Sequence, residues 1–75
     1  MVTVITFYRF VTIDKPAHLQ VELRSLLKSL SIRGTVIVAT EGINGTIAGN
    51  EGAMIRFRDW LGRDPRFCNM PVKVS

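Results

Sequence analysis

Residues 34–49 read GTVIVATEGINGTIAG and contain the pattern that decides the fold. β-branched residues are concentrated in residues 35–39, and a second, shorter apolar run covers residues 46–48, so both segments are predicted to be strands. Between them lie Asn44 and Gly45, which accept the positive φ angles that a two-residue turn between twisted strands requires. We therefore predict a β-hairpin with a tight turn at these two residues.

The N-terminal segment is predicted to be the central strand of the sheet. Residues 2–10 are mostly β-branched and aromatic, which predicts a strand that is buried largely on both faces. Because side chains alternate along a strand, we expect Ile5 and Phe7 on one face and Tyr8 and Phe10 on the other.

One helix is predicted on each side of the hairpin. The first begins where Asp14 precedes Pro16, because a carboxylate caps free N–H groups and proline is tolerated in the first turn. The second begins with Asn50 as its N-cap, continues with Glu51 and ends near Gly62. Each helix has one apolar stripe. The stripes are Leu19, Leu23, Leu26, Leu27 and Leu30 in the first helix, and Ala53, Met54, Phe57, Trp60 and Leu61 in the second.

Residues 72–74 alternate valine and lysine as a short edge strand does, which completes the order strand, helix, strand, strand, helix, strand. Two right-handed halves of this kind form an α+β ferredoxin-like (acylphosphatase-like) βαββαβ sandwich, a four-stranded antiparallel sheet with two helices on one face. We expect Tyr8, Phe10, Val36 and Val38 on the open face. An open apolar face usually meets a partner, here a following domain or a second copy in a homodimer.

Composition restricts the functional classes. The 75 residues form one small domain, residues 1–75, and a net charge of +4 permits an anionic partner. No apolar run approaches the roughly 18 residues of a membrane helix, and the start lacks the features of a signal peptide, so a cytoplasmic protein is expected. Cys68 has no cysteine partner and only His18 as a further metal ligand, so we expect no disulfide and no metal site. We also expect no cofactor in this domain.

The string ATEGINGTIAG, residues 39–49, resembles the signature hairpin of the rhodanese-related tRNA uridine hydroxylases. A strand precedes it, a helix with a Phe and a Trp follows it, and the opening strand that ends in FYRF is similar to the start of that family. The resemblance covers essentially the whole chain but only the N-terminal, acylphosphatase-like domain of the family. It implies an oxygen-dependent, tRNA-modifying oxidoreductase that acts on the wobble uridine.

The same resemblance implies a following rhodanese-like domain on the open sheet face and tRNA, through its anticodon region, as the substrate of the parent protein. The required cysteine of the family lies in the rhodanese-like domain. Cys68 lies in RFCNM, without the glycine and arginine pattern of such a loop, so we predict a half-buried structural thiol and no catalytic residue in this domain. The candidate contacts to tRNA or to the neighbouring domain are Arg9, Lys15, Arg33, Glu41, Gly42, Ile43, Asn44 and Arg56.

Glu41 has two interpretations. Its loop, residues 41–44, contacts the following domain or the tRNA, or its carboxylate accepts backbone N–H groups and braces the turn while Ile43 packs on the core. We favour bracing combined with an interdomain role, because no neighbouring base or nucleophile would make Glu41 catalytic.

Three other functions fit the fold. One is a stand-alone binding or dimerisation module. An acylphosphatase-like hydrolase is disfavoured, because residues 11–18, VTIDKPAH, have no glycine and place Asp14 where an anion would be repelled. Base stacking on the sheet is also disfavoured, because residues 45–49, GTIAG, contain no aromatic side chain.

Overall fold

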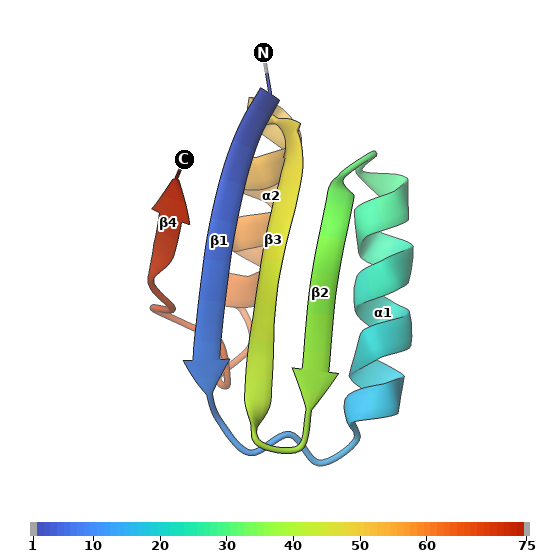
Figure 1. Ribbon diagram of the computed structural model, residues 1–75, viewed down its shortest axis with the longest axis vertical. Coiled ribbons are helices and arrows are strands. Elements are labelled where there is room, and N and C mark those ends of the chain that lie inside the picture. The colour runs from blue at the N-terminus through green and yellow to red at the C-terminus, as the bar shows by residue number, and fades with distance from the viewer. Residues whose placement is uncertain (1, 75) are drawn as a thin grey trace.

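The structure is a computed structural model that describes residues 2–74. Its elements are β1 (Val2–Phe10), α1 (Pro16–Ser29), β2 (Arg33–Ala39), β3 (Gly42–Asn50), α2 (Glu51–Gly62) and β4 (Val72–Val74). The strands form one antiparallel sheet in the order β2-β3-β1-β4. Figure 1 shows α2 behind β1 and β3, and α1 alongside the edge strand β2. The predicted βαββαβ fold is confirmed. Neither described helix is long and apolar enough to cross a membrane.

The core lies between the helices and the covered face of the sheet. Ile5 and Phe7 are each 1% exposed, and the Phe7 ring packs against Phe57 of α2 with the centroids 5.8 Å apart. On the same strand Tyr8 is 66% and Phe10 85% exposed. The prediction that β1 is central is confirmed, but the prediction that it is buried on both faces is wrong, because the helices cover only one side of the sheet.

The two helices begin differently. Asn50 caps α2 as predicted, since its Oδ1 accepts a hydrogen bond from the N–H of Ala53 at 2.8 Å. The predicted cap of α1 by Asp14 is wrong. Pro16 is the first helical residue, so Lys15 occupies the N-cap position and Asp14 lies one residue too far from the first turn. Both apolar stripes contribute to the core as predicted.

The hairpin turn lies at residues 40–41, because Ala39 pairs with Gly42. The prediction of a turn at Asn44 and Gly45 is therefore wrong, and both residues lie inside β3. Turn chemistry identified two residues that tolerate positive φ, but the cross-strand register placed the turn four residues earlier.

Gly45 serves the packing of the core rather than a turn. A Cβ atom at this position would lie 2.8 Å from Cζ of Phe7, 3.0 Å from the carbonyl oxygen of Thr35 and 3.1 Å from Cγ2 of Val36. Because Gly45 has no side chain, the Phe7 ring can pack against the backbone of β3.

We predict that Gly45→Ala lowers the free energy of unfolding by about 1–3 kcal/mol, because the new methyl group overpacks the core. Urea denaturation followed by circular dichroism measures the loss. Gly62→Ala is the matched control, since its Cβ would meet nothing within 4 Å at the end of α2, and it should be neutral or stabilise by up to about 1 kcal/mol. Equal effects of the two substitutions would contradict this account of Gly45.

Candidate functional site

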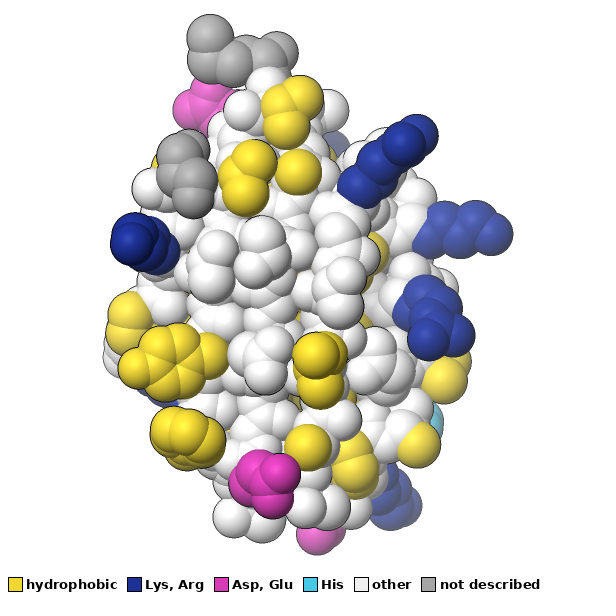
Figure 2. Space-filling model, in the orientation of Figure 1, with side chains coloured by type: hydrophobic (Ala, Val, Ile, Leu, Met, Phe, Trp, Pro, Cys, Tyr) yellow, Lys and Arg dark blue, Asp and Glu magenta, His cyan; other side chains and the backbone are white. Residues whose placement is uncertain are grey.

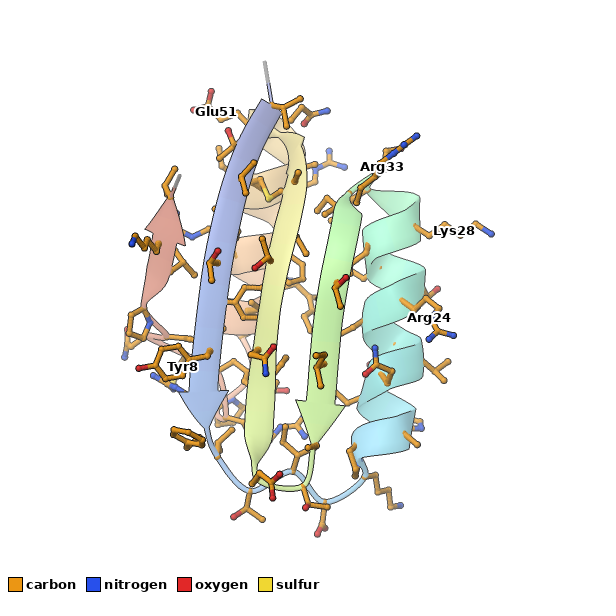
Figure 3. All side chains as sticks on the ribbon, in the orientation of Figure 1. Tyr8, Arg24, Lys28, Arg33 and Glu51 are labelled. Atoms are coloured by element: carbon orange, nitrogen blue, oxygen red, sulfur yellow. The ribbon has the colours of Figure 1, made fainter. Side chains whose placement is uncertain are left out.

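The open face of the sheet carries the side chains that point away from the helices. Tyr8 and Phe10 lie on it as predicted, with their rings edge to face and the centroids 6.1 Å apart. Figure 3 shows Tyr8 near the C-terminal end of β1. The prediction for Val36 and Val38 is wrong: both point to the core, and Ile37 between them is 54% exposed. An error of one residue in phase moves every side chain of a strand to the other face.

The open face is divided along its length. Tyr8, Phe10 and Ile37 give one end an apolar surface, and Figure 2 shows hydrophobic side chains over this part of the sheet. Beyond them a row of threonines crosses three strands, because Thr46 pairs with Thr6 on one side and with Thr35 on the other. The Thr6 and Thr46 hydroxyl oxygens are 3.4 Å apart. The apolar end is therefore the part of this face suited to a protein contact.

A hollow of about 460 Å³ lies at this apolar end, and we call it the open-face hollow. Its lining residues come from β1, the hairpin turn and the two hairpin strands. They are Tyr8, Arg9, Phe10, Ile37, Ala39, Glu41, Gly42, Ile43 and Asn44. Five of the eight candidate contact residues thus lie together, namely Arg9, Glu41, Gly42, Ile43 and Asn44.

The hairpin turn is braced by its main chain. The N–H of Val11 donates to the carbonyl oxygen of Glu41 at 3.0 Å, and the N–H of Ile13 donates to the carbonyl oxygen of Thr40 at 2.9 Å. Ile43 is 3% exposed, so its predicted place on the core is confirmed. The predicted role of the Glu41 carboxylate as the acceptor is wrong, because the carbonyl groups of the turn take those bonds and the side chain is exposed.

The donors of these hydrogen bonds belong to the loop between β1 and α1, so the bonds limit which ligands that loop can hold. In an acylphosphatase-like hydrolase this loop would offer backbone N–H groups to a phosphate. Here the N–H groups of Val11 and Ile13 already donate to the hairpin turn. Two donors of the loop are therefore committed to the fold.

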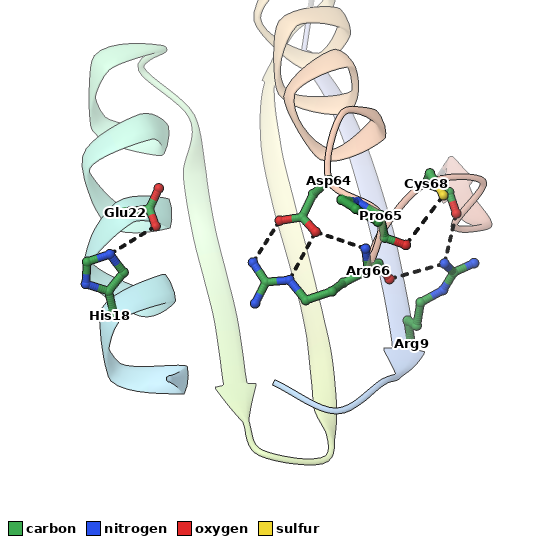
Figure 4. Close-up of polar contacts among 7 residues, drawn as sticks. All are labelled: Arg9, His18, Glu22, Asp64, Pro65, Arg66 and Cys68. Atoms are coloured by element: carbon green, nitrogen blue, oxygen red, sulfur yellow. Dashed lines mark hydrogen bonds and ion pairs between the residues drawn. The ribbon is translucent and has the colours of Figure 1, made fainter. Parts of the chain in front are cut away.

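Arg9 is among the residues that line the open-face hollow, but its guanidinium group binds within the protein. Nη1 donates to the carbonyl oxygen of Cys68 at 2.8 Å and to that of Arg66 at 3.3 Å, as Figure 4 shows. These bonds tie β1 to the segment that connects α2 with β4. Sequence reasoning assigned Arg9 to an outside partner because the acceptors, backbone carbonyls 57 and 59 residues away, have no signature in the sequence.

The segment after α2 is held by an ion pair as well. Arg66 donates from Nη2 to Oδ2 of Asp64 at 2.7 Å and from Nε to Oδ1 at 3.0 Å. The hydrogen bonds from this guanidinium lower the pKa of the Asp64 carboxyl and raise that of Arg66. Cys68 is half-buried as predicted, and its Sγ donates a long hydrogen bond of 3.5 Å to the carbonyl oxygen of Pro65.

The other three candidate residues lie outside the open-face hollow. Lys15 is at the start of α1, and Arg33 begins β2 at the end opposite the hairpin turn. Arg56 lines a separate hollow with Ser29 and Ser31. The candidate contacts predicted from the sequence also leave out two exposed cations of α1, Arg24 and Lys28, although their spacing of four residues places both on one side of that helix.

Comparisons with known proteins agree with this fold. A family model described as the UPF0176 acylphosphatase-like domain matches residues 2–75. A tRNA uridine(34) hydroxylase of Listeria monocytogenes is 37% identical over 72 residues, which cover 96% of this chain and 23% of the relative. A relative with the same name from Bacillus velezensis is 34% identical over 72 residues, and one from Neorickettsia sennetsu is 38% identical over 73 residues. The chain spans about a quarter of the length of these relatives, from 22% to 26%.

We predict that Arg9→Gln lowers the free energy of unfolding by about 1–3 kcal/mol, because two carbonyl groups lose a charged donor. Amide hydrogen exchange should accelerate in residues 64–74 more than in the pairing of β2 with β3. Arg63→Gln is the control, since the one side-chain bond of Arg63 within residues 2–74 is an exposed ion pair with Asp59. This substitution should lower the free energy of unfolding by less than about 1 kcal/mol. Uniform acceleration across the sheet would argue against a local anchor.

We predict that the effect of Asp64→Asn depends on pH. Because the folded carboxyl has a lowered pKa, its stabilisation is present above the unfolded pKa of about 3.9 and is lost as the pH falls through the folded value. The variant should lose about 1 kcal/mol at pH 7 and less as the pH approaches about 2. Urea denaturation of both proteins from pH 7 to pH 2 measures this difference, and parallel curves would contradict the assignment.

Proposed function

Because the chain belongs to the UPF0176 acylphosphatase-like domain family, we propose that it is the N-terminal domain of a tRNA uridine hydroxylase. The parent protein modifies the wobble uridine of tRNA in the cytoplasm and depends on oxygen. This domain supplies contacts to a following rhodanese-like domain and to the anticodon region of the tRNA. The name of the relatives, tRNA uridine(34) hydroxylase, supports the reaction, and their greater length supports a further domain.

The open sheet face is the observation that carries this proposal. Tyr8, Phe10 and Ile37 are 66%, 85% and 54% exposed and lie close together at one end of the sheet. Each side chain of this size contributes roughly 1.5–3 kcal/mol when it is fully buried, so covering the patch favours association strongly. A neighbouring domain of the same chain covers it at high effective concentration.

The chemistry of the reaction belongs to another part of the parent protein. The thiol of Cys68 points to the carbonyl oxygen of Pro65, and its backbone carbonyl accepts from Arg9, so the residue is part of the loop that holds β4. The lining of the open-face hollow combines apolar residues with the polar residues Glu41 and Asn44. Such a surface suits docking, with Glu41 placed to meet a polar group of the docked domain.

The test is a chimera in which this chain replaces the matching segment of the Listeria monocytogenes tRNA uridine(34) hydroxylase. We expect the chimera to hydroxylate uridine 34, measured by mass spectrometry of nucleosides from unmodified tRNA. Phe10→Asp in the chimera should reduce product formation at least tenfold, because burial of a carboxylate in the interdomain contact is costly. Thr12→Asp, at an exposed position outside the open-face hollow, is the matched control and should retain activity.

A chimera that folds but forms no hydroxylated uridine would contradict the proposal. The alternative is a module that dimerises through the same exposed face, and the exposed side chains of that face favour it equally. Sedimentation of the free chain distinguishes the two. A stable dimer that Phe10→Asp dissociates, together with an inactive chimera, would establish the alternative.

A further inference from the structure

Three exposed cations lie together along the outer side of α1 and the start of β2. They are Arg24, Lys28 and Arg33, and we call them the basic ridge. Figure 3 shows all three side chains projecting from the same edge of the molecule, and Figure 2 shows basic side chains there with no acidic side chain beside them.

The ridge is set apart from the acidic residues of the protein. Within residues 2–74, the acidic side chains that contact a basic side chain are Glu22 beside His18, Asp59 beside Arg63 and Asp64 beside Arg66, so none of these contacts involves the ridge. Glu22 belongs to the same helix as the ridge, but it lies about 200° around the axis from Arg24 and contacts His18 at 3.4 Å. The other acids lie at the hairpin end, Asp14 and Glu41, or at the start of α2, Glu51.

Repulsion between the cations of the ridge slightly destabilises the free protein, and a bound polyanion would remove that repulsion. Arg24 and Lys28 are four residues apart, about 6 Å along the helix, and like charges at this spacing destabilise a helix by a few tenths of a kcal/mol. Neutralisation by an anion relieves that repulsion. Lys28 alone has a local benefit, because a cation in the last turn complements the helix dipole, but Arg24 and Arg33 have none of this kind.

The ridge borders a groove of about 210 Å³ between α1 and the edge strand β2. The groove is lined by Gln20, Leu23, Arg24, Leu27, Gly34, Thr35 and Val36. The side-chain amide of Gln20 donates to the carbonyl oxygen of Val36 at 3.0 Å, so this carbonyl group of the edge strand β2 already has a hydrogen-bond partner within the protein. None of these side chains is aromatic, so the groove offers no surface for base stacking.

We propose that the basic ridge binds the phosphate backbone of RNA without reading its sequence. The choice of RNA rests on the proposed function, whereas the location rests on the charge distribution. Guanidinium and ammonium groups in a row suit the phosphates of one strand. The ridge and the open-face hollow are separate, so the domain binds RNA at its α1–β2 edge while its sheet face contacts protein.

The test compares two triple variants of the full chain. Arg24→Gln, Lys28→Gln and Arg33→Gln remove the ridge, and Arg58→Gln, Arg63→Gln and Lys73→Gln remove three exposed cations elsewhere, so both variants have the same net charge. NMR titration of labelled protein with an unmodified anticodon stem-loop RNA gives the dissociation constant, and unfolding in urea verifies that both variants are folded.

For the unmodified chain, three phosphate contacts give a slope of about −2 to −3 in the logarithm of the association constant against log salt, which is roughly 20- to 40-fold between ~50 and ~200 mM salt. The ridge variant should abolish most of this slope, and amide shifts should cluster at α1 and the start of β2. The control variant should retain the slope. Equal weakening by the two variants, or displacement of the RNA by polyglutamate at equal charge concentration, would overturn the proposal.

The chimera separates this proposal from the proposed function. If the chimera is inactive but RNA binding depends on the ridge, the proposed function is wrong and the RNA surface stands. If the chimera is active and the ridge variant leaves its KM for tRNA unchanged, the proposed function stands and the RNA surface is wrong. Both stand if the ridge variant raises the KM for tRNA and the control variant does not.

Discussion

The pairing of β1 with β3 is the constraint on which the rest of the structure depends. It runs from the pair of Val2 with Asn50 to the pair of Phe10 with Gly42 and sets the phase of both central strands. The pair of Phe7 with Gly45 lies within it, so the large ring has room only because its partner lacks a side chain. From this register follow the covered core and the outward position of Tyr8 and Phe10.

Much of the fold could be predicted from periodicity, and the two errors within the hairpin share one cause. The helices, the order of elements and the inward position of Ile5 and Phe7 followed from local patterns. The turn and the outward face of β2 depended on which residues pair across the hairpin. Asn44 and Gly45 are compatible with a turn as well as with a strand, so their residue types alone could not determine which residues pair across the hairpin.

The candidate site was predicted only in part. Some of its residues have neighbours that are close in sequence, whereas Arg9 binds groups that are far from it in sequence. The residues of the hairpin are close in sequence, so grouping them required no tertiary information. Arg9 was misjudged because its partners are backbone carbonyls of a distant loop. Arg24 and Lys28 were not predicted as contact residues because a charged helix face is usually just solvated. This helix face differs from such a face in that the acidic residues lie elsewhere in the fold, which the sequence does not reveal.

The main-chain bonds between the hairpin turn and the loop after β1 also bear on how this surface can change during evolution. The fold requires the carbonyl groups of Thr40 and Glu41, which every amino acid supplies, and makes no use of the Glu41 carboxylate within the described chain. Substitutions at these two residues of the hairpin turn should therefore change the free energy of unfolding little. A partner that changes its own docking surface can be followed by substitutions at this turn while the sheet beneath keeps its register.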